Sequence, residues 1–180
     1  MGNKRSRTVL VGLGAAIGAF GAAVMTSAAT TPIARADDFT DIINNIETDL
    51  AAGQSEFGFA ETAFASNQVI SGTAELLSAA DDDFVAAPDS VLLGTVEALT
   101  NEPVTGVDPD LVLPPANFAD ALTDVQGEFT VAQTLSSDAV TALAGGDYGN
   151  AVGDELDSSL FADVFPAETL LLGGLEALGL

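Results

Sequence analysis

Apolar and small residues recur along this chain in alternating steps of four and three, the spacing of one face of an α-helix. The first long run of the pattern comprises Phe39, Ile43, Ile46, Leu50, Gly53, Phe57, Ala60 and Phe64. No proline interrupts the chain between residues 37 and 87. The pattern predicts one helix over residues 37–65 whose apolar seam packs on a partner helix. A bend or break is expected near Gly53, because glycine is a poor helix former.

Two further helices are predicted before the next proline-rich segment. Helical spacing returns over residues 69–80 after a turn at residues 66–67, which predicts a second helix that runs antiparallel to the first. Residues 81–83 are three aspartates and are expected to form the next turn, and Pro88 suits the first turn of a third helix. Residues 91–99 are apolar almost all round, so we expect them to be buried.

The whole pattern recurs 79 residues later, at Phe118, Leu122, Val125, Phe129, Ala132, Ser136, Ala139 and Leu143. At the same spacing, Leu-Leu-Gly at 92–94 and Glu-Ala-Leu at 97–99 recur at 171–173 and 176–178. We therefore predict an all-α helical bundle built from two tandem copies of a three-helix unit, residues 37–99 and 118–180. The alternative is a chance match of alanine-rich sequence. Residues 100–117 hold four of the seven prolines and are predicted to be an extended linker.

Two units of about 60 residues are each marginal alone, so the copies are expected to pack together as one domain related by a pseudo-twofold. The candidate apolar interface residues are Leu92, Val96, Leu99, Leu171, Leu175 and Leu178. The C-terminal stretch, residues 170–180, is predicted to fill the core between the copies. The alternative is insertion into a membrane or into the groove of a partner, although about a dozen residues are too few to span a bilayer.

The first 36 residues differ from the rest of the chain. Lys4, Arg5 and Arg7 precede an uncharged run over residues 8–25, and the segment ends in Ala34-Arg35-Ala36. This is the pattern of a signal peptide with a small-x-small cleavage site, in which Ala34 and Ala36 mark the cut. Retention of the run as an uncleaved membrane anchor is the alternative, since its length just suffices to span a bilayer. Cleavage would leave no membrane span and a protein secreted or held in the cell envelope.

Charge narrows the possible partners. All four basic residues lie in the first 36 positions and none of the 27 acidic residues do, so residues 37–180 contain no Lys, Arg or His. Such a chain cannot neutralise phosphates, which excludes DNA and RNA as ligands. The expected partners are basic protein surfaces, with self-association and an apolar ligand as further possibilities. Stability should rise with salt and with mild acid, because both weaken repulsion between carboxylates.

The residue types missing from residues 37–180 also argue against catalysis. Without His, Lys, Arg or Cys, residues 37–180 lack the usual general base, thiol nucleophile, Schiff-base amine and cationic clamp. We therefore predict that the protein is not an enzyme and carries no cofactor. Asp81, Asp82 and Asp83 are weak metal candidates, but no EF-hand pattern follows them and a solvated acidic turn is favoured. Glu97 and Glu176 are expected to be solvated, because no cation nearby could pair with them.

Two segments carry a family resemblance. They are Asp-Asp-Phe-Thr-Asp-Ile at 37–42 and Gly-Thr-Val-Glu-Ala-Leu-Thr-Asn-Glu-Pro at 94–103. Together with the Ala-Arg-Ala-Asp-Asp junction at 34–38, they resemble uncharacterised small, acidic, exported proteins of mycobacteria. The resemblance implies an extracytoplasmic location and supplies no activity.

Two functions from different classes follow from the sequence. The first is an exported, non-enzymatic interaction or structural module that uses its acidic surface. The alternative is a carrier or binding module that holds an apolar, lipid-like ligand between the two repeats.

Overall fold

The computed structural model describes residues 35–107 and 113–180, and in this part of the chain the structure is all α-helical, with no strands. Its helices are α2 (Ala36–Ala65), α3 (Val69–Asp81), α4 (Ala87–Thr100), α5 (Phe118–Gly145), α6 (Tyr148–Ser159) and α7 (Phe165–Leu178). The predicted signal peptide lies outside the described residues, except that Arg35 precedes α2 and Ala36 begins it. Gly53 neither ends nor interrupts α2, so the break expected there does not occur.

The second and third predicted helices form one rod. A π-helical turn, η1 (Asp82–Ala86), joins α3 to α4, and Asp82 and Ala87 both have right-handed helical dihedral angles. The turn predicted at residues 81–83 is therefore wrong. The N–H of Ala87 donates to the carbonyl of Asp82, five residues earlier, immediately before Pro88. Because proline lacks an N–H and crowds the preceding turn, the wider π spacing lets the helix continue through it.

The same construction recurs in the second half of the chain. The π-helical turn η2 (Leu160–Val164) joins α6 to α7, and the N–H of Phe165 donates to the carbonyl of Leu160 just before Pro166. The described chain thus forms four long rods, α2, α3–α4, α5 and α6–α7, in place of the six helices predicted from the sequence.

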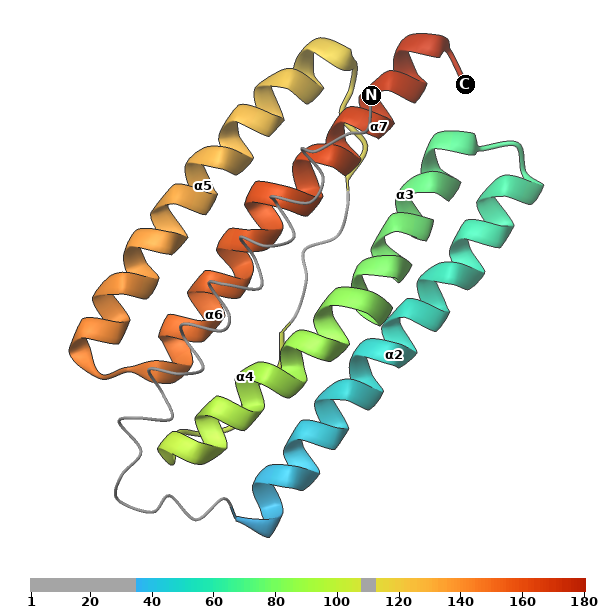
Figure 1. Ribbon diagram of the computed structural model, residues 1–180. Helices are drawn as coiled ribbons and strands as arrows, with labels where there is room; N and C mark the ends of the chain where they lie inside the picture. The colour runs from blue at the N-terminus through green and yellow to red at the C-terminus, as the bar shows by residue number, and fades with distance from the viewer. Residues whose placement is uncertain (1–34, 108–112) are drawn as a thin grey trace, which may run out of the picture.

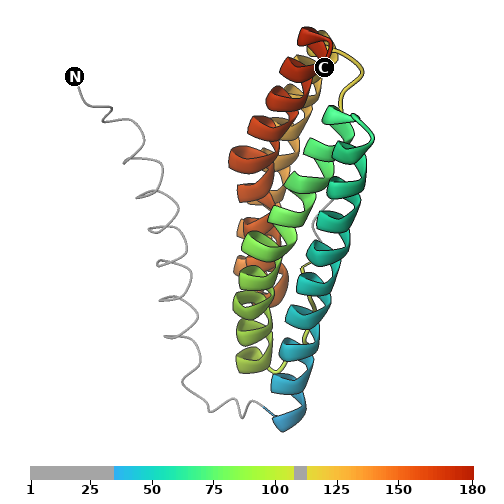
Figure 2. The ribbon, with the colours of Figure 1, turned by 90° about the vertical axis from the view of Figure 1, so that its right-hand side faces the viewer.

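The four rods form two antiparallel hairpins (Figures 1 and 2). In the first hairpin α2 packs on α3 and α4, and in the second α5 packs on α6 and α7. The hairpins meet through their returning rods, since α4 contacts α6 and α3 contacts α7. Helices α2 and α5 therefore lie on the outside of the array, each against its own partner rod (Figure 1). The predicted all-α bundle is confirmed.

A buried apolar cluster lies where the hairpins meet. It consists of Leu93, Val96, Val107, Val152 and Leu156, with Leu92 and Tyr148 packed against it. Val107 belongs to the segment between the hairpins, and the same segment is held by Glu102, whose carboxylate accepts the N–H of Gly149 at 2.7 Å. The connection thus contributes a side chain to the core and does not merely span the distance between α4 and α5.

The buried faces of the outer helices are built mainly from small residues. On α2 the buried positions are Ile42, Asp49, Gly53, Ala60 and Ala63, and on α5 they are Ala121, Ala132 and Ala139. The predicted seam holds for Gly53 and Ala60, but its large members Phe39, Ile43, Leu50, Phe57 and Phe64 remain 38–61% exposed. Small residues let two helix backbones approach closely, and large neighbours on the same helix are then left at the side of the contact.

Several contacts within the first hairpin are repeated within the second, at positions 79 residues later in the chain. The hydroxyl of Ser90 donates to Oδ2 of Asp49 at 2.8 Å, and the hydroxyl of Thr169 donates to Oε1 of Glu128 at 2.6 Å. Gly94 lies against Ile42, and Gly173 lies against Ala121. Each hairpin therefore joins its two rods by a hydroxyl–carboxylate hydrogen bond and a closely packed glycine at corresponding positions.

Candidate functional site

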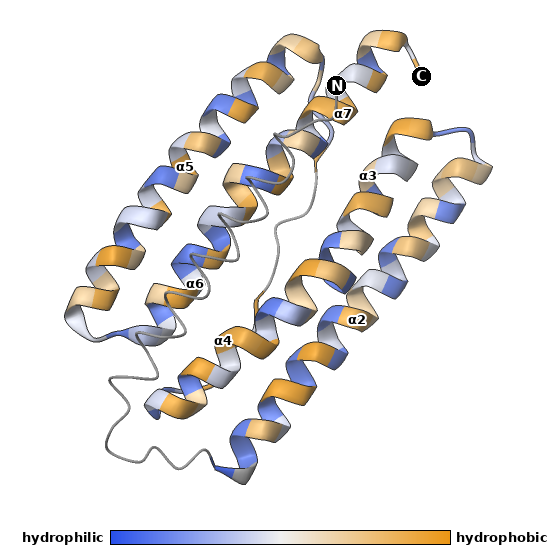
Figure 3. Cartoon of the chain, viewed as in Figure 1, coloured by the Kyte–Doolittle hydropathy of each residue, from blue (hydrophilic) through white to orange (hydrophobic). Residues whose placement is uncertain are grey.

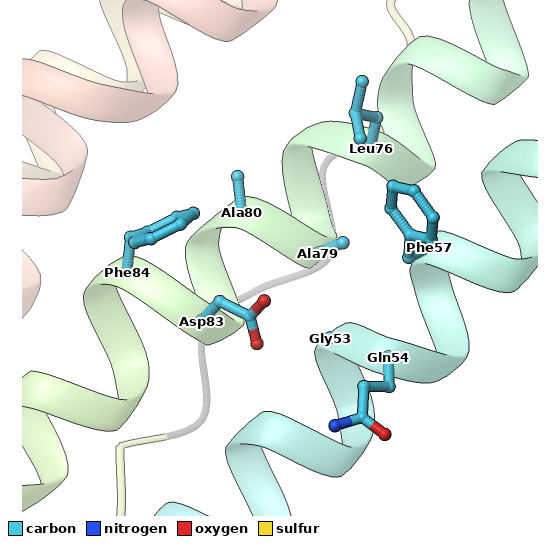
Figure 4. A pocket seen from close by; sticks show the side chains of 8 residues that line it. All are labelled: Gly53, Gln54, Phe57, Leu76, Ala79, Ala80, Asp83 and Phe84. Atoms are coloured by element: carbon cyan, nitrogen blue, oxygen red, sulfur yellow. The ribbon is translucent and has the colours of Figure 1, made fainter.

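An apolar groove runs between α2 and the rod α3–α4 in the first hairpin. It has a volume of about 320 Å³ and is lined by Gly53, Gln54, Phe57, Leu76, Ala79, Ala80, Asp83 and Phe84. Figure 4 shows Phe57 of α2 pointing toward Leu76 of α3, while Phe84 lies further along the rod beside Ala80. Three large apolar side chains therefore line one opening, with a single carboxylate, Asp83, among them.

Glycines set the distance between the two walls of this groove. A methyl group at Gly53 would lie 2.7 Å from Oδ1 of Asp83 and 3.1 Å from the carbonyl oxygen of Ala79. Near the other end of the hairpin, the ring of Phe64 covers Gly72, where a methyl group would lie 2.8 Å from the ring. Because both positions lack a side chain, α2 approaches the rod closely at Gly53, and the ring of Phe64 packs onto the rod at Gly72.

The groove belongs to a longer apolar strip on α2, which we call the α2 stripe: Phe39, Ile43, Leu50, Phe57 and Phe64. Successive members from Ile43 onward are seven residues apart, so they stack along one side of the helix. Glu47 and Glu61, both exposed, follow Ile43 and Phe57 by one turn and border the stripe. Figure 3 shows hydrophobic segments recurring along α2 as well as along the central rods. A stripe of this kind on an outer helix is typical of an interaction surface.

The second hairpin repeats the first part of the stripe but not the large apolar residues of the groove. Phe118, Leu122 and Phe129 are 43–47% exposed on α5 at positions that correspond to Phe39, Ile43 and Leu50. The residues that correspond to the three large groove residues Phe57, Leu76 and Phe84 are polar, namely Ser136, Glu155 and Asp163. The apolar surface in the middle of the first hairpin therefore has no apolar counterpart in the second.

Paired carboxyl groups lie next to the groove. Burial, repulsion by the Asp82 carboxylate and a hydrogen bond donated to that carboxylate together raise the pKa of Glu56 in α2 to about 7. Below about pH 7 Glu56 therefore holds a proton and donates it to Asp82. The pair connects α2 to the π turn η1 without any cation.

A second pair joins the two hairpins. Burial and repulsion by Asp81 raise the pKa of Glu168 to about 8, and burial raises the pKa of Asp81 to about 6. Asp81 and Glu168 are hydrogen-bonded to each other. Oδ2 of Asp81 and Oε2 of Glu168 meet no N–H or O–H donor from other groups in the described parts of the chain. A proton held on Glu168 and donated to Asp81 satisfies both atoms.

Buried carboxyls elsewhere find hydroxyl or backbone donors. Ser90, which donates to Asp49, accepts the N–H of Val107 at 3.0 Å, so the Asp49 carboxylate anchors the connecting segment through Ser90. Burial raises the pKa of Glu128, although the hydrogen bond from Thr169 opposes that shift. Burial, together with repulsion by Asp157, also raises the pKa of Asp89 to about 6.

The three weak metal candidates do not converge. Asp81 faces Glu168, Asp82 faces Glu56, and Asp83 lines the apolar groove against Gly53. Three successive helical residues point about 100° apart, which explains the divergence. Asp81 and Asp82 are buried, so the expectation of a solvated acidic turn is wrong. Within the described residues, no group of three or more Asp, Glu, His or Cys side chains is placed to hold a metal ion.

The candidate interface residues differ in how deeply they are buried. Val96 is buried in the junction between the hairpins and Leu92 packs against it, while Leu99 and Leu175 are half-buried. Leu171 and Leu178 are exposed, as are Leu170 and Leu180. The C-terminal stretch therefore fills the core only in part, chiefly through Leu172, which is fully buried in α7.

The expectation that Glu97 is solvated is also wrong. Glu97 is buried, and its carboxylate accepts hydrogen bonds from the N–H of Thr105 at 2.7 Å and from the Thr105 hydroxyl at 2.6 Å. Its partners come from the connecting segment eight residues later and not from a cation. Glu176, at the corresponding position of α7, is half-buried.

Sequence reasoning missed the groove itself. The sequence pattern places Phe57 in a seam that packs on a partner helix and Leu76 in the second predicted helix, and Phe84 lies just after the predicted turn. The sequence does indicate the groove, because the large residues of the seam lie in one column along the helix and Gly53 and Ala60 lie in the neighbouring column. Separating small from large residues in the pattern would have distinguished the packed face from the exposed one.

No family model, curated protein or solved structure matches this chain. None of the described helices is long and apolar enough to cross a bilayer. The groove, the α2 stripe and the carboxyl pairs are therefore the features that bear on its function.

Proposed function

We propose that this protein is an exported, non-enzymatic helical interaction module of the cell envelope or extracellular space. The observation that carries the proposal is the α2 stripe, a row of large apolar side chains left exposed on an outer helix and hollowed by a groove. An exposed apolar row costs solubility and contributes little to folding, so a binding role accounts for it best. The many carboxylates around it supply the acidic surface expected of such a module.

The two hairpins are proposed to be products of a tandem duplication. The recurrence of the sequence pattern at 79 residues supports this, as do the matching Asp49–Ser90 and Glu128–Thr169 hydrogen bonds. The unit of duplication would be a hairpin of two rods. Export rests on the basic start and the Ala34-Arg35-Ala36 junction of the sequence.

An apolar ligand is the second candidate function, favoured by the size of the groove. Its volume of about 320 Å³ falls at the lower end of small-molecule sites. The ligand would lie in this groove of the first hairpin, because Leu93, Val96 and Val152 fill the junction between the hairpins. Uptake of a fluorescent fatty acyl probe by delipidated protein, lost in F57S, would support this function. No uptake by the wild-type protein would eliminate it.

Site-specific photo-crosslinking tests the interaction module. A benzophenone amino acid is placed at Phe57 or, as the control, at Phe59, which lies on the same helix, is 59% exposed and points to a different side. The protein is exported by its native host and irradiated there. We expect a discrete crosslinked species from position 57 and none from position 59. Equal or absent crosslinking from the two positions would refute a binding role for the α2 stripe.

A further inference from the structure

The groove in the first hairpin combines a shape and a charge pattern that together select one class of partner. Phe57, Leu76 and Phe84 form an apolar opening, and Asp83 lies within it. Glu61 and Glu47 border the α2 stripe along its exposed flank. An occupant must therefore present large apolar side chains along one face and must tolerate one carboxylate within the groove and two more along the exposed flank of the α2 stripe.

Charge complementarity decides between the possible occupants. Residues 37–180 carry 27 acidic side chains and no basic ones, so a second copy would bring carboxylates against carboxylates with no cation between them. An anionic lipid surface meets the same repulsion. A segment with lysine or arginine beside its apolar face is attracted to Asp83 in the groove and to Glu47 and Glu61 along α2.

The shape favours a helical segment. The members of the α2 stripe are exposed at seven-residue intervals, which matches the spacing of apolar residues along one face of an amphipathic helix laid beside α2. The groove then receives one or two large apolar side chains of that helix between Phe57 and Leu76. The polar residues Ser136, Glu155 and Asp163 remove this receptor from the second hairpin.

We infer that the groove between α2 and α3–η1 is the docking site for a cationic amphipathic helix of another protein, with one such helix bound per chain. The inference rests on the proposed function and specifies the partner class and the hairpin that binds it. It requires both the apolar contact and the flanking carboxylates.

Model peptides test the apolar requirement at constant charge. The probe is a leucine–lysine peptide of about 18 residues, or about five helical turns, patterned as an amphipathic helix, and its control has every leucine replaced by alanine at equal charge. Calorimetric titration into residues 37–180 at moderate salt should give one site, with the leucine peptide bound at least about tenfold more tightly than the alanine peptide. Equal affinities would overturn the inference, because charge alone would then explain binding.

Two sets of variants place the site on the molecule. F57S/F84S should abolish the preference for the leucine peptide, while the matched variant F59S should keep it. Both change exposed side chains, and circular dichroism checks that helix content is retained. The converse variant S136F/E155L/D163F builds the apolar residues into the second hairpin and should raise the stoichiometry from one peptide to two. An unchanged preference in F57S/F84S, or an equal loss in F59S, would overturn the inference.

The remaining outcomes separate this inference from the proposed function. Dimers of the wild-type protein that F57S/F84S dissociates, seen by sedimentation equilibrium, would make a second copy the occupant. Binding to phosphatidylcholine vesicles that F57S/F84S removes would make a lipid surface the occupant. Either result overturns the cationic helix while leaving an interaction module. If position 57 gives no crosslink in the native host, the interaction module itself is refuted.

Discussion

The two hairpins agree in what holds them together and differ in what they expose. Each joins its rods by a hydroxyl–carboxylate hydrogen bond, Ser90 to Asp49 and Thr169 to Glu128, and by a closely packed glycine. The groove residues Phe57, Leu76 and Phe84 have polar counterparts in the second hairpin. The contacts required by the fold are thus shared, whereas the three large apolar residues that line the groove occur in the first hairpin alone.

The largest expected effect is the pH dependence of stability that arises from the carboxyl pairs. One pair lies within the first hairpin and the other joins the two hairpins. Burial raises the folded-state pKa of Glu168 from 4.5 to about 8 and that of Glu56 to about 7. The unfolded chain then loses its protons first as pH rises, so the contribution of these two groups to stability is greatest below about pH 4 and falls until about pH 8. We expect a total loss on the order of 2–4 kcal/mol in urea unfolding, since partial exposure screens part of each shift.

Glutamine variants separate this effect from general charge repulsion. E168Q should flatten much of the pH dependence, because its amide keeps the hydrogen bond to Asp81 without titrating. The control E176Q removes one carboxylate from the same helix and should leave the slope nearly unchanged. Equal slopes in the two variants would assign the pH dependence to overall charge and would contradict a special role for Glu168.

The second prediction compares the two hydroxyl–carboxylate bonds. S90A removes the donor to Asp49 and also the acceptor for the N–H of Val107, whereas T169V removes only the donor to Glu128. We expect S90A to cost about 2–3 kcal/mol and T169V about 1 kcal/mol in free energy of unfolding. A larger cost for T169V would show that the connecting segment is not anchored through Ser90.

The third prediction tests the closely packed glycines. A methyl group at Gly173 would lie 2.5 Å from Cβ of Ala121, while none of the described atoms outside its own helix lies within 4 Å of one at Gly174. G173A should destabilise the protein by about 1 kcal/mol after the gain in helix propensity is counted, and G174A should stabilise it by up to about 1 kcal/mol. Thermal unfolding followed by circular dichroism gives the two shifts, and a stabilised G173A would contradict the close approach of α5 and α7.

The smallest effect is expected at the groove. Phe84 is 78% exposed on the π turn, so F84S should change the free energy of unfolding by less than about 0.5 kcal/mol. Chemical denaturation measures this directly. A loss above about 1 kcal/mol would mean that Phe84 serves the fold of the first hairpin and is not free to serve a partner.

The sequence predicted most of the helices, because their apolar spacing and terminal residues are local properties of the chain. It did not predict the continuous rods, since aspartates at 81–83 followed by Pro88 look like a turn until the π spacing accommodates the proline. The burial of Asp81, Asp82 and Glu97 was missed for a related reason. Their partners are other carboxyls, a hydroxyl and a backbone N–H, brought together only by folding.

The candidate site was less predictable than the fold. Regular spacing shows that residues share a side of a helix, but it does not tell which of two adjacent columns meets the neighbouring rod. On α2 the column containing Gly53 and Ala60 makes the contact, and the column containing Leu50 and Phe57 is left outside. The choice depends on how closely the backbones approach, which is a property of the pair of helices.

The π turns also govern how the chain tolerates changes in length. Each holds its helix together with bonds that reach one residue further than in an α-helix. Deleting one residue from Asp82–Ala86 would let the backbone close to ordinary α-helical spacing with little loss of helix. Because the π turn spends one residue more than an α turn on about the same rotation, that deletion would leave α4 close to its present orientation, with Ser90 still facing Asp49. Deleting one residue from an α-helical part of the rod would instead rotate everything after it by about 100° and dismantle the tertiary structure.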